Sequence, residues 1–211
     1  LQITEQQWRE NNMPSPTPAG KPAANLMSGQ FINIQKLHIA KMLTDEAGGT
    51  ATYEKPIPLG KLLRKVDIKP QTNQAELFAD GQSVDTASNT ASYDLTFDTA
   101  ALPLEYVAYL LGHAIENGVM KAGKDDVAPY FAVLFQSDKR NGKKRLTKFY
   151  KVQFLEPSES GNSKQESIQF DTPTLTAKAI YRLSDGLSYA KADEEAAGFA
   201  AETGTKWYEQ V

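Results

Sequence analysis

The chain has 211 residues, of which 40% are hydrophobic and 23% are charged, and its net charge is −3. This length suits one domain, or two at most, with a sizeable core. The slightly acidic balance argues against a surface that wraps nucleic acid, and the absence of cysteine excludes disulfides, thiolate metal sites and cysteine nucleophiles. The sequence also has no apolar run near the roughly 20 residues that span a bilayer, and its first residues do not have the pattern of a signal peptide.

Residues 1–30 are predicted to form an extended arm. Met13–Gln30 is rich in proline, alanine and glycine, a composition that cannot close a core by itself and that favours polyproline conformation. Two interpretations stay open: a tail without a role, or an arm that orders against a neighbouring subunit. Trp8 favours the second, because aromatic anchors are common at interfaces.

From Phe31 the pattern is mostly β. Ser92–Asp98 is the clearest strand, because Tyr93, Leu95 and Phe97 alternate with polar residues. Further strands are predicted over Asn33–Met42, Ala51–Glu54, Lys61–Ile68, Glu76–Ala79, Tyr130–Gln136, Leu146–Leu155, Ser167–Phe170 and Thr174–Tyr181. Loops, the first two with room for short strands, are expected over Leu43–Pro58, Lys69–Asp85 and Glu156–Glu166. Hairpin-type dipeptides that favour tight turns occur at Asp80-Gly81, Asn141-Gly142 and Asp185-Gly186.

One principal helix is predicted near residues 103–117. Pro103 suits the first turn, and Gly118 suits the position after the last turn. Between them, apolar residues recur at helical spacing at Leu104, Val107, Leu110, Leu111 and Ile115. A second, short helix is predicted over Glu194–Ala201. The chain thus divides into the arm 1–30, a β domain over 31–190 and a C-terminal extension over 191–211.

The sequence gives no sign of catalytic, cofactor-binding or metal-binding residues. His38 and His113 have no partner at metal-ligand spacing, so both are predicted to be structural. The adjacent carboxylates Asp125-Asp126 and Glu194-Glu195 are predicted to be solvated, because sequence neighbours point apart. Gly48-Gly49 does not have the Lys-Ser/Thr of a phosphate loop and is predicted to be a flexible loop. An enzyme is therefore not expected.

A basic cluster surrounds the Asn141-Gly142 turn, with five positive charges in seven residues: Lys139, Arg140, Lys143, Lys144 and Arg145. Three interpretations stay open. The cluster is a solvated hairpin tip that discourages aggregation, a contact for an acidic patch on a neighbouring subunit, or a contact for phosphate.

Five ordered segments resemble one known family. They are Ile34–Lys65, Ala75–Ala87 (AELFADGQSVDTA), Leu102–Gly118 (LPLEYVAYLLGHAIENG), Ala128–Arg145 and Phe170–Ile180. Together they resemble the major tail protein, or tail-tube subunit, of long-tailed, non-contractile bacteriophages, over roughly residues 31–190.

The resemblance implies an antiparallel β-sandwich or rolled barrel of the tail-tube type with one principal flanking helix. It implies a structural virion protein without cofactors that assembles in the host bacterial cytoplasm. Its rings, typically of six subunits, stack into the tail tube through which DNA passes. The expected partners are further copies of the chain, the tape-measure protein, and terminator and distal tail proteins. Double-stranded DNA passes only transiently, and no membrane is involved.

Within such a tube, Asp94 and Asp98 are the candidates for the channel wall, with an outer, solvent-facing position as the alternative. The candidate inter-subunit residues are Trp8, Phe78, Asp80 and the five basic residues Lys139, Arg140, Lys143, Lys144 and Arg145. The competing function is a non-viral, soluble β-sandwich module that binds carbohydrate or protein. Its sugar platform would use Tyr53, Tyr93 and Tyr189.

Overall fold

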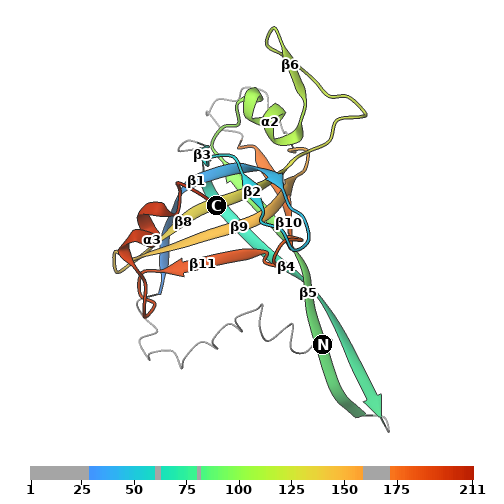
Figure 1. Cartoon of the computed structure of the whole chain (residues 1–211), viewed down its shortest axis with the longest axis vertical. Helices are drawn as coiled ribbons and strands as arrows, with labels where there is room; N and C mark the ends of the chain where they lie inside the picture. Colours follow the sequence, from blue (N-terminus) through green and yellow to red (C-terminus); the bar gives the residue numbers. More distant parts are fainter. Residues whose placement is uncertain (1–28, 60–62, 80–81, 159–171) are drawn as a thin grey trace, which may run out of the picture.

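The structure is a computed structural model, and it describes residues 29–59, 63–79, 82–158 and 172–211. These residues form a mainly β fold with antiparallel pairing throughout (Figure 1). The strands are β1 (Phe31–Thr44), β2 (Thr52–Tyr53), β3 (Ile57–Pro58), β4 (Leu63–Ala79), β5 (Gln82–Thr99), β6 (Ala114–Glu116), β7 (Val119–Lys121), β8 (Tyr130–Lys139), β9 (Lys144–Phe154), β10 (Thr174–Ile180) and β11 (Tyr189–Asp193). The helices are α2 (Leu104–Leu111) and α3 (Ala201–Lys206).

Nine of these strands form one sheet in the order β2-β1-β8-β9-β10-β5-β4. β3 pairs with β1, and β11 pairs with β9, while β6 and β7 form a separate hairpin. β1 also contacts β4, although four strands separate them in the sheet order. The sheet is therefore rolled, so that one of its faces encloses the core.

The core lies on that inner face and is built on aromatic side chains. Phe131 packs edge-on against Phe154 at 5.8 Å between ring centroids, and Tyr109 of α2 packs against Phe131 at 5.3 Å. Leu110 of α2 is fully buried in the same cluster. The prediction of a mainly β fold is therefore confirmed, and α2 is the helix that packs on its core.

The outer face of the sheet has two halves. Over β1 and β8 it is apolar, and the C-terminal segment covers it: Trp207, Tyr208 and Val211 pack on a small buried cluster of Ala40, Ala132 and Leu134. Over β10, β5 and β4 it carries polar residues that are partly exposed. The boundary that was predicted at residue 190 falls inside β11, so residues 191–211 continue the sheet and then cover it.

The principal helix is shorter than predicted. It ends at Leu111, because Gly112 adopts a left-handed conformation with φ +76°. Ile115 lies in β6 instead, and Gly118 belongs to the β6–β7 turn, where Asn117 has φ +51° and Gly118 has φ +76°. Two successive positive φ angles are typical of the tight hairpin turn that Asn-Gly favours. The prediction of helix up to residue 117 was therefore wrong.

Two further predictions differ from the structure, and others lie outside the described residues. The region predicted as a loop over Lys69–Asp85 belongs, in its described residues, to the long strands β4 and β5, and the strand predicted inside it at Glu76–Ala79 is the end of β4. The helix predicted over Glu194–Ala201 is a series of turns, and α3 begins only at Ala201. The strand predicted over Ser167–Phe170 lies outside the described residues, as do Trp8 and Asp80.

Candidate functional site

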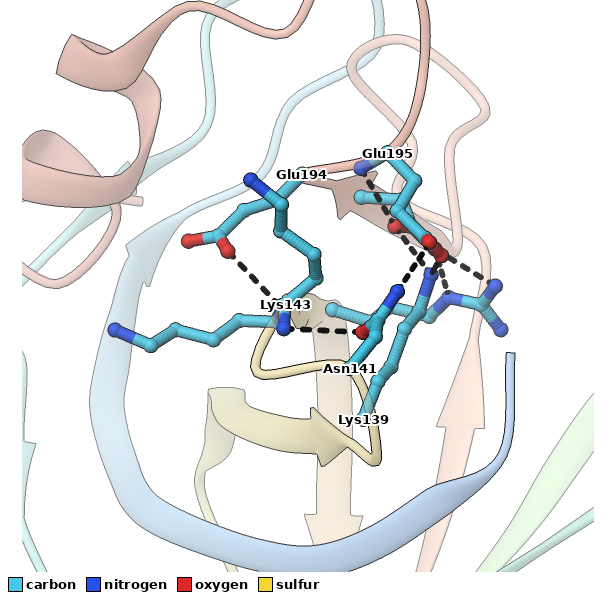
Figure 2. A network of polar contacts seen from close by, with 8 residues as sticks. Lys139, Asn141, Lys143, Glu194 and Glu195 are labelled. Carbon is cyan, nitrogen blue, oxygen red and sulfur yellow. Dashed lines mark hydrogen bonds and ion pairs between the residues drawn. The ribbon is translucent and has the colours of Figure 1, made fainter. Parts of the chain in front are cut away.

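The predicted hairpin tip between β8 and β9 is present, and its basic residues bind carboxylates of the same chain. Lys139, whose side chain is 2% exposed, donates to Asp193 Oδ1 at 2.6 Å and also to Glu195. Arg145 Nε donates to Asp193 Oδ2 at 2.8 Å, and Asn141 Nδ2 donates to Glu195 Oε1 at 2.5 Å. Figure 2 shows Lys139 and Asn141 converging on Glu195.

This cluster corrects two predictions. Lys139 is buried and paired with Asp193 and Glu195 of the same chain, so it is neither solvated nor free for a neighbour. Arg145 stays partly exposed but is also paired with Asp193. Glu194 and Glu195 are accordingly not simply solvated: Glu194 Oε2 accepts the backbone N–H of Lys144 at 3.0 Å. Asp193 and Glu195 lie 54 and 56 residues from Lys139 in the chain, a separation at which a sequence pattern does not indicate contact.

The electrostatics of the cluster favour the ionised pair. Burial alone lowers the pKa of Lys139, but hydrogen bonds to Asp193 and Glu195 outweigh it and raise that pKa. Burial raises the pKa of Asp193, and the hydrogen bond from Lys139 and those from the Glu195 N–H and Arg145 lower it below its usual range. Both groups therefore stay charged near neutral pH, and the cluster fixes residues 193–195 to the hairpin.

Three basic side chains remain exposed at the same tip. Arg140, Lys143 and Lys144 are exposed and make no ion pair with any residue that the structure describes. Next to them Phe31 is 49% exposed, with the Arg145 guanidinium 4.8 Å above its ring. This part of the tip has charge and apolar area left for another molecule.

Asp94 and Asp98 lie on the open polar face of β5, as the alternation predicted. Asp94 is flanked by Lys69 of β4 and Lys178 of β10, and Asp98 by Lys65 of β4. On these rows of the sheet the acidic residues are thus matched by lysines, three of each: Asp67, Asp94, Asp98, Lys65, Lys69 and Lys178. The face is polar but close to neutral, rather than acidic.

The outer halves of β4 and β5 project from the sheet as a two-stranded ribbon (Figure 1). They pair from Thr72 with Thr90 to Ala79 with Gln82, and Phe78 lies near the far end. From Gln82 to Ser92, β5 pairs only with β4 in the described part of the chain, and β4 is the last strand of the sheet. An isolated ribbon of this kind is marginally stable, and its unpaired edges are templates for another chain.

His113 has two acidic partners that its sequence neighbourhood did not indicate. Its Nδ1 lies 2.7 Å from Asp126 Oδ2 and its Nε2 lies 2.9 Å from Glu156 Oε1, and the ring is 6% exposed. Asp126, which was predicted to be solvated, is exposed and also pairs with His113. His38 differs: its Nδ1 lies 2.9 Å from the carbonyl oxygen of Lys36, and its ring packs on Tyr208.

The remaining features concern metal binding, the three tyrosines of a sugar platform and membrane spanning. Among the described residues, no group of three acidic, histidine or cysteine side chains suits a metal ion. Tyr93 packs on Tyr189 with ring centroids 5.4 Å apart, whereas Tyr53 donates to the carbonyl of Tyr150. No contact joins these three tyrosines into one sugar platform among the residues described. None of the described helices is long and apolar enough to cross a membrane.

Comparison with protein-family models finds no match for this chain, and comparison with curated proteins finds none either.

Proposed function

We propose that this protein is a structural subunit that assembles with further copies of itself into stacked rings, as the major tail protein of long-tailed, non-contractile bacteriophages does. The observation that carries this proposal is the β4–β5 ribbon. Its strands are 17 and 18 residues long, well above the five or six residues of an average strand. Over about half of that length the two strands pair only with each other in the described part of the chain.

A ribbon of this length has a physical reason to bind another chain. The residues Gln71–Ala75 and Thr86–Asn89 are exposed, so the ribbon gains little from its own subunit. Pairing with a neighbouring strand would satisfy the N–H and C=O groups along its edges. If the ribbon binds a different surface on the next copy, the contact is heterologous, and its repetition produces rings or open tubes.

The open face over β10, β5 and β4 is the proposed wall of the channel. A polymer of negative charge is held by a basic wall and repelled by an acidic one. The Asp94 and Asp98 rows, where each carboxylate lies beside a lysine, would do neither strongly. DNA would pass such a wall without being retained. In the virion the partners would be the tape-measure protein inside the tube, with terminator and distal tail proteins at its ends.

Electron microscopy of the purified protein over a concentration series tests the proposal. Rings or hollow tubes of uniform diameter are expected, and their reconstruction would give the subunit number and identify the face that lines the channel. A chain that stays monomeric up to its solubility limit would contradict the proposal. It would favour the competing function, a soluble module that binds carbohydrate or protein.

A further inference from the structure

β11 has one edge that is not paired in the described part of the chain. It pairs with β9 from Tyr189 opposite Phe149 to Asp193 opposite Arg145. Two backbone hydrogen bonds show which residues of β11 point their N–H and C=O groups at β9. The Tyr150 N–H donates to the Ser188 carbonyl, and the Glu194 N–H donates to the Lys144 carbonyl.

This hydrogen-bond pattern determines which backbone groups of β11 face away from β9. In an antiparallel pair, alternate residues direct both their N–H and C=O groups at the partner strand. Ser188, Ala190, Ala192 and Glu194 therefore face β9. The backbone groups of Tyr189 and Lys191 point the other way, and both of these residues are exposed. β11 thus presents a short row of donors and acceptors that can bind another strand.

This edge lies beside the place where the β4–β5 ribbon leaves the sheet. Tyr93 of β5 packs on Tyr189 of β11, and the Tyr181 hydroxyl donates to the Thr90 carbonyl at 2.8 Å. Beyond Thr90 the ribbon extends away from β11 (Figure 1). The ribbon of the same chain therefore does not cover the β11 edge.

The charges of the two surfaces are complementary. The outer halves of the ribbon, Gln71–Ala79 and Gln82–Ala91, contain Glu76 and Asp85 but no lysine or arginine. At the β11 edge, Asp193 and the following Glu195 are already paired with Lys139 and Arg145. Lys191 on β11 and the exposed Arg140, Lys143 and Lys144 of the neighbouring hairpin tip have no such partner among the described residues.

We propose that the outer half of the β4–β5 ribbon of one copy docks along the free edge of β11 in a second copy. This inference rests on the proposed function, self-assembly, and names the two surfaces that meet. Backbone hydrogen bonds at Tyr189 and Lys191 provide the pairing, and the basic residues select the acidic ribbon. Because donor and acceptor are different surfaces, the contact is head to tail.

Cross-linking between single-cysteine variants tests the docking. The chain has no cysteine of its own, so each variant carries one thiol. Lys191→Cys on β11 is mixed with Ala87→Cys on the exposed ribbon, and a short bismaleimide is added over a protein concentration series. The matched control replaces Ala87→Cys by Lys55→Cys, an exposed position beside β2 and β3 at the other end of the sheet.

A heterologous cross-linked dimer that increases with concentration is expected for Lys191→Cys with Ala87→Cys, and none above background for the control. Electron microscopy of the same samples separates the two proposals. Rings or tubes without this cross-link would overturn the docking site while self-assembly stands. A strong cross-link in samples that never form rings or tubes would support the docking and contradict the tube.

A charge exchange gives an independent readout. Lys191→Glu is expected to raise the concentration at which assembly begins, because it places like charges at the contact. Glu76→Lys in the same chain is expected to restore assembly, whereas Lys55→Glu leaves it unchanged. A double variant that assembles no better than Lys191→Glu alone would contradict the proposed pairing of these surfaces.

Discussion

His113 is held by two carboxylates, and this geometry determines its protonation state. An ionised carboxylate only accepts hydrogen bonds, so each ring nitrogen has to donate, at 2.7 Å to Asp126 and 2.9 Å to Glu156. The imidazole is therefore protonated in this arrangement. The hydrogen bonds with Asp126 and Glu156 raise the pKa of His113 above its usual value, and burial opposes them only in part.

The raised pKa predicts a pH-dependent contribution to stability. A group whose pKa is raised on folding stabilises the fold fully below its unfolded pKa of about 6.5 and loses that effect as pH rises through the folded pKa. His113→Gln should therefore lower the free energy of unfolding more at pH 6 than at pH 9. Proton NMR gives the pKa directly: the chain has two histidines, and His38→Gln assigns the signals. A His113 signal that titrates at or below about 6.5 would contradict the imidazolium.

Asp45 connects three parts of the chain on the outer face. Its carboxylate, 5% exposed, accepts Lys151 Nζ of β9 at 2.6 Å. It also accepts the backbone N–H groups of Leu183 and Ser184 at 3.0 Å each. The turn between β10 and β11 is thereby held against β9 and the end of β1.

We predict that Asp45 contributes stability that acid removes. Burial raises the pKa of Asp45, but the bonds from Lys151 and the two backbone N–H groups lower it to about 2. This shift corresponds to about 2 kcal/mol, present above pH 4 and lost as pH falls towards 2. Asp45→Asn should cost about 3 kcal/mol at pH 7, because Lys151 stays buried without its anion.

Urea denaturation at pH 7 and pH 3 measures both effects. The control is Asp67→Asn, which removes an exposed ion pair with Lys65 and should cost less than about 1 kcal/mol. Equal losses for Asp45→Asn and Asp67→Asn would show that the Asp45 contacts do not hold the turn.

At the scale of elements, local sequence signals predicted most strands and the Asn141-Gly142 turn. They did not predict the lengths of α2, β4 and β5. Asn141-Gly142 forms the predicted hairpin, with the Lys139 N–H bonded to the Lys143 carbonyl at 2.8 Å. Leu110 and Leu111 lie in α2, as their helical spacing predicted. Ile115 has the same spacing but lies in β6, so the spacing alone extended the predicted helix too far. Of the ribbon's first strand only Glu76–Ala79 was predicted as a strand within the loop Lys69–Asp85, because Gln71–Asn73 is polar on both faces and no alternation marks it as strand.

Gly112 ends α2, and its substitution measures how firmly that end is fixed. A Cβ atom at this position would lie 2.6 Å from the carbonyl oxygen of Val127, and φ is +76°. Gly112→Ala should therefore cost about 3 kcal/mol, from both backbone strain and the displaced carbonyl. Gly118→Ala has the same φ in open space and should cost only about 1 kcal/mol. Thermal and urea unfolding of both variants check this, and equal losses would contradict the close approach to Val127.

At the scale of the whole molecule, the properties that bear on assembly depend on contacts between distant segments. The pairing of Lys139 with Asp193 and the row that joins Lys69, Asp94 and Lys178 are visible only once the sheet is formed. The sequence predicted Asp94 correctly as a polar-face residue but not its lysine neighbours. For the same reason it predicted a basic cluster at the tip without distinguishing the paired Lys139 from the exposed Lys143.

The ribbon permits a test that separates folding from the proposed assembly. Among the side chains that the structure describes, the buried ones come from other strands, α2 and the sheet half of β4 and β5, whereas Gln71–Ala75 and Thr86–Asn89 are exposed. Replacing Thr72–Thr90 by an Asn-Gly turn should therefore change the free energy of unfolding by less than about 1 kcal/mol. The same variant should form no rings or tubes at concentrations where the full chain does. The variant should still bind the ribbon of a full-length copy through its β11. Because it has no ribbon of its own, no further subunit should add to it, and the assembly should stop growing. Assembly that persists without the ribbon would show that other edges suffice, and a large loss of stability would show that the ribbon belongs to the folding unit.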